Sequence, residues 1–395
     1  MTNVFATDVM KQAFMDGVQD ENRSAIPMAQ VSDIDTENLE VMNNRFGSDF
    51  TADTTSDGTY AVNNFELAND SLAISKQAVY AERIQTKDLV HAGDAWDIVA
   101  DRTDRHTRAL GVAVHRSTYS TTVDGAGLIL DNEVLAGSTS AGTPITMSAT
   151  NPDDVATKVY ALMQDAGVAA SQGRPYFMID PSTARFFKLF GMSAGFNVAD
   201  RQIMKGFEIL PTFDFDYVVT PEVEHEQVYT VSSAVQDNTI TVKGVTLTLR
   251  NAPSAAGQVD VGSDDEGSLD NLAAALNGGA GAGSAYIALT AANRLILKNA
   301  GVKAVVTSAT TLTVTAYGSI AGAEVSAGAF GTEQKNLLAG LRNSTHLALP
   351  SKGFFVNEIN EVPGFTGSEL RSTQIHDSTV WTKNKPKICK VVVVA

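Results

Sequence analysis

The composition of residues 226–328 differs sharply from that of the sequence on either side. Short segments rich in Thr and Val alternate there with loops of Gly, Ser and Ala, and the stretch contains no Cys, Trp or Met. TITVKG followed by VTLTLR predicts a hairpin with Val245, Leu247 and Leu249 on one face. Leu269–Leu276 is typical of a helix, and AYIAL, RLILKN and TLTVTAY are typical of further strands. A run of this kind, entered and left through polar loops, predicts an inserted mainly-β domain.

The sequence before and after this insertion predicts an α+β fold. Residues 94–225 open with a helical pattern that runs from Asp94 to about Tyr119 and places Leu110 and Ala113 in its buried stripe. A helix of roughly 24 residues would be about 36 Å long, which exceeds the usual length in globular proteins.

A compact group of elements is expected after this long helix. Asn151-Pro152 predicts a helix start, and Gly167 can end that helix. Pro175–Ile179 is a strand candidate, and Asp180-Pro181 starts a helix that Gly191 is expected to stop. A short helix is predicted over 199–205, with strand material after it.

Residues 329–395 are expected to return to this α+β core. Glu333–Arg342 is predicted to be helical, and strands lead from it to the basic tail KNKPKICKVVVVA. The tail carries Lys383, Lys385, Lys387 and Lys390. Such a cluster is usually a solvated face, and the alternatives are pairing with acidic surface on a neighbouring copy or contact with packaged nucleic acid.

The first 60 residues are too polar to form a core of their own. They hold eleven acidic and three basic residues, a net charge of −8, which is half of the −16 of the whole chain. Thr7 could cap a short helix with Val9, Met10, Phe14 and Val18 on one side. Residues 1–60 therefore predict an extended arm that becomes ordered against something else. Residues 61–93 predict a long polar hairpin or loop.

Composition excludes several classes of protein. With 29 Lys and Arg against 45 Asp and Glu, the chain repels phosphate, so a dedicated nucleic-acid-binding protein is not expected. The single cysteine, Cys389, excludes an internal disulfide framework and a multi-cysteine zinc site. No stretch offers about 20 mainly apolar residues, and the start does not read as a secretory signal, so we expect a soluble protein suited to a reducing cytoplasm, with no membrane partner.

Short motifs suggest no catalytic, cofactor or metal site. Gly191–Gly195 matches the G-x-S-x-G pattern around Ser193, but a nucleophile elbow needs a strand before its serine, and a helix is predicted there. The six histidines are scattered without ligand spacing. Gly278–Gly283 lacks the ending of a phosphate-binding loop, and Ser263–Gly267 lacks the alternating ligands of a calcium loop. We expect a glycine-rich loop tip and a solvated acidic turn.

The order of these parts resembles the major capsid protein of tailed double-stranded DNA bacteriophages, the Hong Kong ninety-seven type of fold. The passages that carry the resemblance are DDVATKVYALMQDAGV, RPYFMIDPSTARFF, VADRQIMKGFEIL and STQIHDSTVWTKNKPKICKVVVV. The resemblance covers about 1–225 and 330–395. It implies an N-arm (1–60), an E-loop (61–93), a spine helix with the P and A domains (94–225) and a return to that core (329–395), with the mainly-β insertion (226–328) outside the family pattern.

The resemblance implies a structural protein, not an enzyme, that self-assembles into an icosahedral shell around a double-stranded DNA genome. Implied partners are further copies of the chain in hexamers and pentamers, a portal, scaffolding or decoration proteins, and DNA held by weak non-specific contact. The implied location is the virion capsid, assembled in the host bacterial cytoplasm. Lys76 and Lys87 lie in the expected E-loop, but no acceptor asparagine for covalent cross-linking can be matched. The alternatives are an encapsulin-like nanocompartment shell protein and a serine hydrolase using Ser193.

Overall fold

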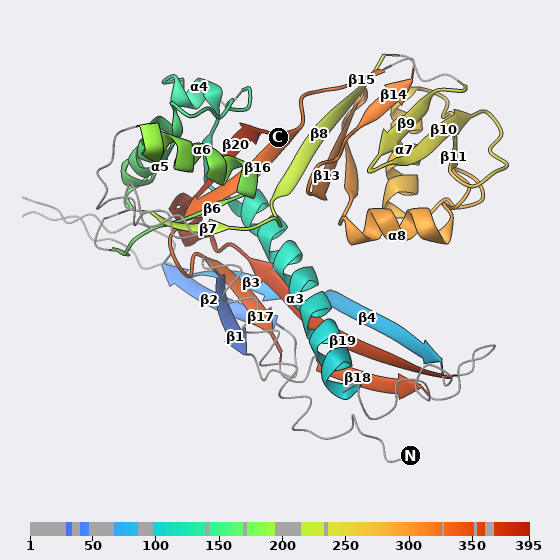
Figure 1. The fold of residues 1–395 in the computed structure, drawn as a ribbon, viewed down its shortest axis with the longest axis horizontal. Helices are drawn as coiled ribbons and strands as arrows, with labels where there is room; N and C mark the ends of the chain where they lie inside the picture. Colours follow the sequence, from blue (N-terminus) through green and yellow to red (C-terminus); the bar gives the residue numbers. More distant parts are fainter. Residues whose placement is uncertain are drawn as a thin grey trace, which may run out of the picture. The chain divides into compact units, whose positions relative to one another are not determined.

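The computed structural model describes residues 29–33, 40–46, 67–85, 98–138, 142–168, 172–193, 215–232, 236–325, 328–350, 354–359 and 367–395 (Figure 1). The chain divides into two compact units, each assembled from distant parts of the sequence. Unit 1 comprises Met1–Gly125 and Arg342–Lys385, and unit 2 comprises Ala126–Leu341 and Pro386–Ala395. The predicted helix that Thr7 could cap, the helix over 199–205 and Lys87 lie outside the described residues.

Unit 1 is built from one long helix and antiparallel strands from both ends of the chain. Its elements are β1 (Ala29–Asp33), β2 (Glu40–Phe46), β3 (Leu67–Ala73), β4 (Lys76–Gln85), α3 (Ile98–Gly125), β17 (Thr345–Leu349), β18 (Phe354–Ile359) and β19 (Gly367–Thr379). The 13-residue β19 pairs with β4, β18 and β17, β1 adds to β17 in parallel, and β2 pairs with β3. The short helix η5 (Thr382–Lys387) leads into unit 2. Figure 1 shows α3 running along the sheet of β4, β19 and β18.

The predicted long helix is confirmed, with two corrections. It has 28 residues, about 42 Å of rise, and it continues to Gly125, beyond the expected end at Tyr119. Ala113 was predicted to be buried, but it is exposed, because the buried face passes through His106, Leu110 and Val114 at steps of four residues.

The segment predicted as a long polar hairpin or loop, about residues 65–90, contains two strands where the structure describes it, and these strands do not pair with each other. β3 and β4 are strands, but β3 pairs with β2 and β4 pairs with β19. Leu72 and Ile74, at the β3 end, are buried against Ala348 and Trp381. This apolar contact and the ten-residue register with β19 hold the two strands to different partners.

Unit 2 is organised around β16, which pairs with three other strands. The elements of the unit are β5 (Leu128–Leu130), α4 (Asn132–Leu135), α5 (Pro152–Asp165), β6 (Tyr176–Ile179), α6 (Pro181–Ser193), β7 (Asp216–Val219), β8 (Glu224–Val231), β9 (Thr239–Val242), β10 (Val245–Arg250), β11 (Gln258–Asp260), α7 (Asp265–Asn277), α8 (Ala291–Asn299), β12 (Lys303–Ser308), β13 (Thr311–Tyr317), β14 (Ala323–Val325), β15 (Gly328–Phe330), β16 (Gln334–Gly340) and β20 (Ile388–Val394). A nine-stranded sheet contains the order β12-β13-β8-β16-β20-β5, with β6, β7 and β15 off that path, and a second sheet has the order β11-β10-β9-β14.

The helix predicted over Glu333–Arg342 is wrong, because residues 334–340 form β16. Its residues from Lys335 to Gly340 are all buried, and the strand bonds to β8 and β6 along one edge and to β20 along the other. A strand covered on both faces has no alternation of polar and apolar residues, so its short apolar run resembles part of a buried helix.

The elements before the insertion agree with the sequence more closely. α5 begins at Pro152, and Gly167 follows its end with φ of +82°. Asn151 does not cap the helix through its side chain; its Oδ1 accepts a hydrogen bond from the backbone N–H of Ser148 at 2.9 Å. β6 is a fully buried strand as predicted.

A cluster of buried apolar residues lies within residues 226–328. The buried cluster there runs from Tyr229 to Ile320 along the chain, and the partly buried side chains against it end at Phe330. The hairpin of β9 and β10 and the helix α7 are confirmed, and Val245, Leu247 and Leu249 are buried together on one face. The nine-stranded sheet nevertheless continues across the expected boundary, since β8 bonds to β16. The start of the insertion at residue 226 therefore remains a prediction, which the buried cluster supports.

Two of the strands predicted in this region do not form. RLILKN lies in helix α8, whose start is capped by Thr290 accepting from the N–H of Asn293 at 3.3 Å. That cap fixes helical periodicity, so Leu297 is buried while Leu295 and Ile296 are exposed. AYIAL is irregular and contributes only isolated bridges of Tyr286, to Val259 and Ala282. TLTVTAY is strand β13, as predicted.

Candidate functional site

The sheet of β4, β19 and β18 has one face packed on α3. His106 of α3 is fully buried, and its Nδ1 lies 2.6 Å from the Oγ of Ser372 in β19. The ring of Tyr80 in β4 meets the His106 ring edge-on, with 4.7 Å between centroids, and Glu82 Oε1 lies 3.7 Å from His106 Nε2. These contacts join the long helix to two strands that are far apart in sequence.

The opposite face of this sheet carries exposed apolar and charged side chains. Val79 and Phe355 are each 48% exposed. Arg83 Nε donates to Glu369 Oε2 at 2.8 Å, and Arg371 Nη2 donates to Glu369 Oε1 at 2.8 Å. The hydrogen bonds from Arg83 and Arg371 hold the pKa of Glu369 below its usual range. The two guanidinium groups remain about half exposed, whereas the Glu369 side chain that both contact is 6% exposed.

Lys76, the lysine of the expected E-loop that the structure describes, takes part in contacts within its own subunit. Its Nζ lies 3.0 Å from Asp377 Oδ1 in β19 and donates to Thr121 Oγ1 in α3 at 3.3 Å. Burial alone would raise the pKa of Asp377, but the hydrogen bonds from Lys76 and from backbone N–H groups hold it below its usual range. Lys76 therefore contributes to the anchoring of β4 on α3 and β19.

A second polar cluster centres on Glu333, between β15 and β16. Its Oε1 accepts from His225 Nδ1 at 2.6 Å and from the N–H of Ile320 at 2.9 Å, and its Oε2 accepts from Ser319 Oγ and the N–H of Ala321, each at 3.1 Å. Burial alone would raise the pKa of Glu333, but the hydrogen bond from His225 and those from the backbone lower it to about 2. Glu333 thus joins the chain entering the insertion to the chain leaving it.

A buried ion pair joins β16 to the start of α6. Lys335 Nζ lies 3.0 Å from Asp180 Oδ2 and donates to Ser182 Oγ at 2.6 Å, while Asp180 also accepts from the N–H groups of Ser182 and Thr183. Asp180 therefore both caps α6 and neutralises a buried ammonium group. The polar atoms of Lys335, Asp180 and Ser182 are thus used on contacts with one another.

Ser193 is the last residue of α6, so the helix predicted before it is confirmed. Gly191 was predicted to stop that helix, and this prediction is wrong, because the helix continues for two residues beyond Gly191. A nucleophile elbow requires a strand to lead directly into its serine. The backbone at Ser193 therefore does not have the geometry of an elbow.

The described histidines are divided between the two units. His106, His115, His346 and His376 lie in unit 1 and His225 lies in unit 2. Within the described ranges, no three His, Cys, Asp or Glu side chains are grouped so that they could hold a metal ion.

Both loop motifs of the insertion have structural roles. Asp264, in the acidic turn, caps α7 by accepting from the N–H of Gly267 at 2.8 Å. Gly278, at the start of the glycine-rich loop, ends α7 in a left-handed conformation with φ of +65°, which glycine adopts most easily. Tyr286 then donates from its hydroxyl to the carbonyl of Gly279 at 2.6 Å.

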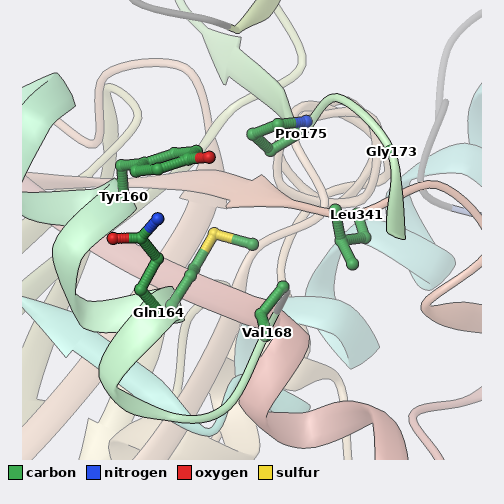
Figure 2. Close-up of a pocket in the computed structure, with 7 residues that line it drawn as sticks. Tyr160, Gln164, Val168, Gly173, Pro175 and Leu341 are labelled. Atoms are coloured by element: carbon green, nitrogen blue, oxygen red, sulfur yellow. The ribbon is translucent and has the colours of Figure 1, made fainter. Parts of the chain in front are cut away.

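A small hollow in unit 2 lies between α5 and the start of β6 (Figure 2). Tyr160 and Gln164 line it from the helix, and Pro175 and Leu341 line it from the other side. The space between these residues is about 240 Å³ and is partly open to solvent. Since ligand pockets usually hold about 300–1,000 Å³, the hollow suits a water molecule better than a substrate.

The lysines of the basic tail differ in their surroundings. Lys383 and Lys385 are exposed on η5, whereas Lys390 Nζ lies 3.6 Å from Glu226 Oε2. Cys389 is buried, and burial raises the pKa of its thiol to about 12, which makes it a poor nucleophile at neutral pH.

Sequence reasoning identified neither Glu333 nor the pair of Lys335 and Asp180. Their partners lie 108 and 155 residues away along the chain. No local spacing signals such contacts, because strand pairing within the sheet brings the residues together. Across the part of the chain that the structure describes, no helix is both long enough and apolar enough to cross a membrane.

No protein-family model matches the sequence, and no curated protein matches it either. Among solved structures, the fold is similar to the capsid of the cyanophage P-SCSP1u, with a TM-score of 0.46, 10% identity, and coverage of 93% of this chain and 86% of that chain. The capsid of Ralstonia phage GP4 gives a TM-score of 0.46, 10% identity, and coverage of 93% and 87%. A virus-like particle from Pyrococcus furiosus gives a TM-score of 0.40 and 9% identity, with coverage of 98% of each chain. Most of the similar structures are from bacteriophages.

Proposed function

We propose that this chain is the major capsid protein of a tailed double-stranded DNA bacteriophage. The observation that carries the proposal is the order and pairing of its elements. β4 comes before a 28-residue helix, a compact α+β group and an insertion follow, and the C-terminal strands β19 and β20 return to pair with β4 and β5. This order supports the assignment of E-loop, spine helix and P and A domains to 61–93 and 94–225, with 329–395 completing them.

The polar groups described above support a structural role in preference to catalysis. Glu333 and the pair of Lys335 and Asp180 use their hydrogen-bonding capacity on contacts within the subunit. Ser193 ends a helix, where an elbow would need a strand before it. Among the described residues, the sheet of β4, β19 and β18 in unit 1 has one face that α3 does not cover, and such a face suits contact with another protein.

The nanocompartment shell is the second candidate, because such a shell also needs contact surfaces and no active site. A nanocompartment subunit would ordinarily be shorter and would lack a long arm and an insertion. The arm of 1–60 and the buried cluster within residues 226–328 favour the phage capsid. Portal, scaffolding or decoration proteins, and weak contact with packaged DNA, belong to the same proposal, as do a place in the virion and assembly in the bacterial cytoplasm.

The contents of the particle distinguish these two candidates. Particles would be isolated from cells that produce the virus, treated with nuclease, and then opened. A phage capsid should protect double-stranded DNA of uniform length, whereas a nanocompartment should hold a protein cargo and no protected DNA. Particles that contain protein cargo alone would overturn the assignment to a phage.

A further inference from the structure

The sheet of β4, β19 and β18 presents a row of three side chains on the face away from α3. Val79 lies opposite Thr373, and Thr373 lies opposite Phe355. Directly opposed residues project from the same face of a sheet, and neighbours along a strand alternate between faces. Ser372 contacts His106 of α3, so the row through Thr373 is on the other face. Its two outer members are each 48% exposed.

Basic side chains continue this face toward one end of the strands. The next row contains Arg371 between Ala81 and Asn357, and the row after it contains Glu369 beside Arg83. The side chains of Arg83 and Arg371 are 55% and 49% exposed, whereas Glu369, which both contact, is 6% exposed. The face therefore offers an apolar row bordered by two guanidinium groups and fits a segment that is apolar and acidic.

Residues 1–28 of the chain have that chemistry. Val9, Met10, Phe14 and Val18 recur at helical spacing, and acids lie among and beyond them at Asp8, Asp16, Asp20 and Glu21. A chain of 28 residues can span up to about 90 Å when extended, which is enough to reach a neighbouring subunit.

We propose that residues 1–28 of a neighbouring copy dock on this open face, with their apolar side chains over Val79 and Phe355 and their acids beside Arg83 and Arg371. The inference rests on the proposed shell and names the surface that receives its arm. Burial of the apolar groups dominates, because the exposed charges are screened by water and salt.

Cross-linking between two differently tagged chains tests the docking. One full-length chain carries Phe14→Cys, the other carries Phe355→Cys, and they are assembled together and oxidised. Native Cys389 is buried and should not compete. We expect a disulfide between the two tags in assembled particles. Val305→Cys, at a position 60% exposed in β12, replaces Phe355→Cys as the matched control and should give none.

The outcomes separate the docking from the shell itself. Closed particles without a Phe14–Phe355 cross-link, or with equal cross-linking at Val305, would overturn the docking and leave the shell intact. Cross-links formed only when both cysteines are in one chain would place the arm on its own subunit and also overturn the proposal. A wild-type chain that forms no particles would overturn the proposed function on which the inference rests.

Charge substitutions on the open face provide a second measurement. Val79→Asp and Phe355→Asp should each reduce the yield of closed particles at least about tenfold, because a carboxylate cannot be buried against the apolar stripe. Val305→Asp is the control and should leave the yield within about twofold. Circular dichroism of each variant should match the wild type, since these side chains are already exposed. Full particle yield from both open-face variants would contradict the docking.

Discussion

Glu333 holds His225 through a 2.6 Å hydrogen bond, and these two residues mark the points where the chain leaves and enters the insertion. The carboxylate also accepts from the backbone N–H groups of Ile320 and Ala321. Strands from both sides of the insertion are thereby held at one position beside β16. The stability of unit 2 should depend on this carboxylate.

Glu333→Gln should lower the free energy of unfolding by about 1–3 kcal/mol, because an amide cannot satisfy all of these donors. Its pKa of about 2 is below the ordinary value of 4.5, so the ionised form is favoured in the folded state. The stabilisation should therefore be fully present above about pH 4.5 and decline as the pH falls toward 2. Denaturant unfolding at a series of pH values checks this. A difference between wild type and variant that persists unchanged at the lowest pH would contradict it.

The pair of Lys335 and Asp180 should behave as a coupled unit. Lys335→Met leaves a buried carboxylate without its ammonium partner and should cost about 3–5 kcal/mol. Asp180→Asn should cost a similar amount, and the double variant should lose clearly less than the sum of the two single losses. Urea unfolding of the four proteins measures the coupling. Strict additivity would show that the contact contributes little.

Ser193 should carry no chemistry. Ser193→Ala should leave particle assembly unchanged, and a fluorophosphonate probe should not label the wild-type protein, because a helix precedes this serine. Stoichiometric labelling that the substitution abolishes would support the hydrolase alternative instead.

The insertion should be dispensable for closure of the shell, and we expect it to project from the outer face. Replacing residues 226–328 by a short Gly/Ser linker removes Glu226 and the rest of β8 beyond it, but Glu224 and His225 stay opposite β16, which also keeps its bonds to β20 and β6. Closed particles of lower stability are therefore expected, and electron microscopy with thermal unfolding measures both properties. If the shortened chains are all insoluble, the insertion belongs to the core of unit 2.

Sequence patterns predicted the elements whose signals are local. Pro152 marked the start of α5, and the alternation of Val245, Leu247 and Leu249 marked β10. The same reasoning failed for β16, because a strand buried on both faces lacks alternation, and for α8, where apolar β-type residues follow a Thr290 cap. The pairs of His225 with Glu333 and of Asp180 with Lys335 could not be predicted, since their members are more than 100 residues apart and meet through sheet pairing.

The arm is expected to act between subunits. Deleting residues 1–28, the part of the arm that precedes β1, should leave a folded and soluble chain that forms few complete shells, because β1 and β2 pair with β17 and β3 of their own subunit. Phe14→Asp should impair assembly more than neutralising Asp33 and Asp35, because burying a large apolar side chain is worth about 1.5–3 kcal/mol and an exposed ion pair only about 0–1 kcal/mol. Sedimentation beside circular dichroism checks both points. Loss of folding would show that the arm belongs to the core of its own subunit.

The central claim is that the chain builds a closed shell from copies of itself. Negative-stain electron micrographs of the purified full-length protein test it most directly. The account predicts uniform, closed particles with icosahedral outlines. Fields that contain only dispersed single subunits or irregular aggregates would contradict it.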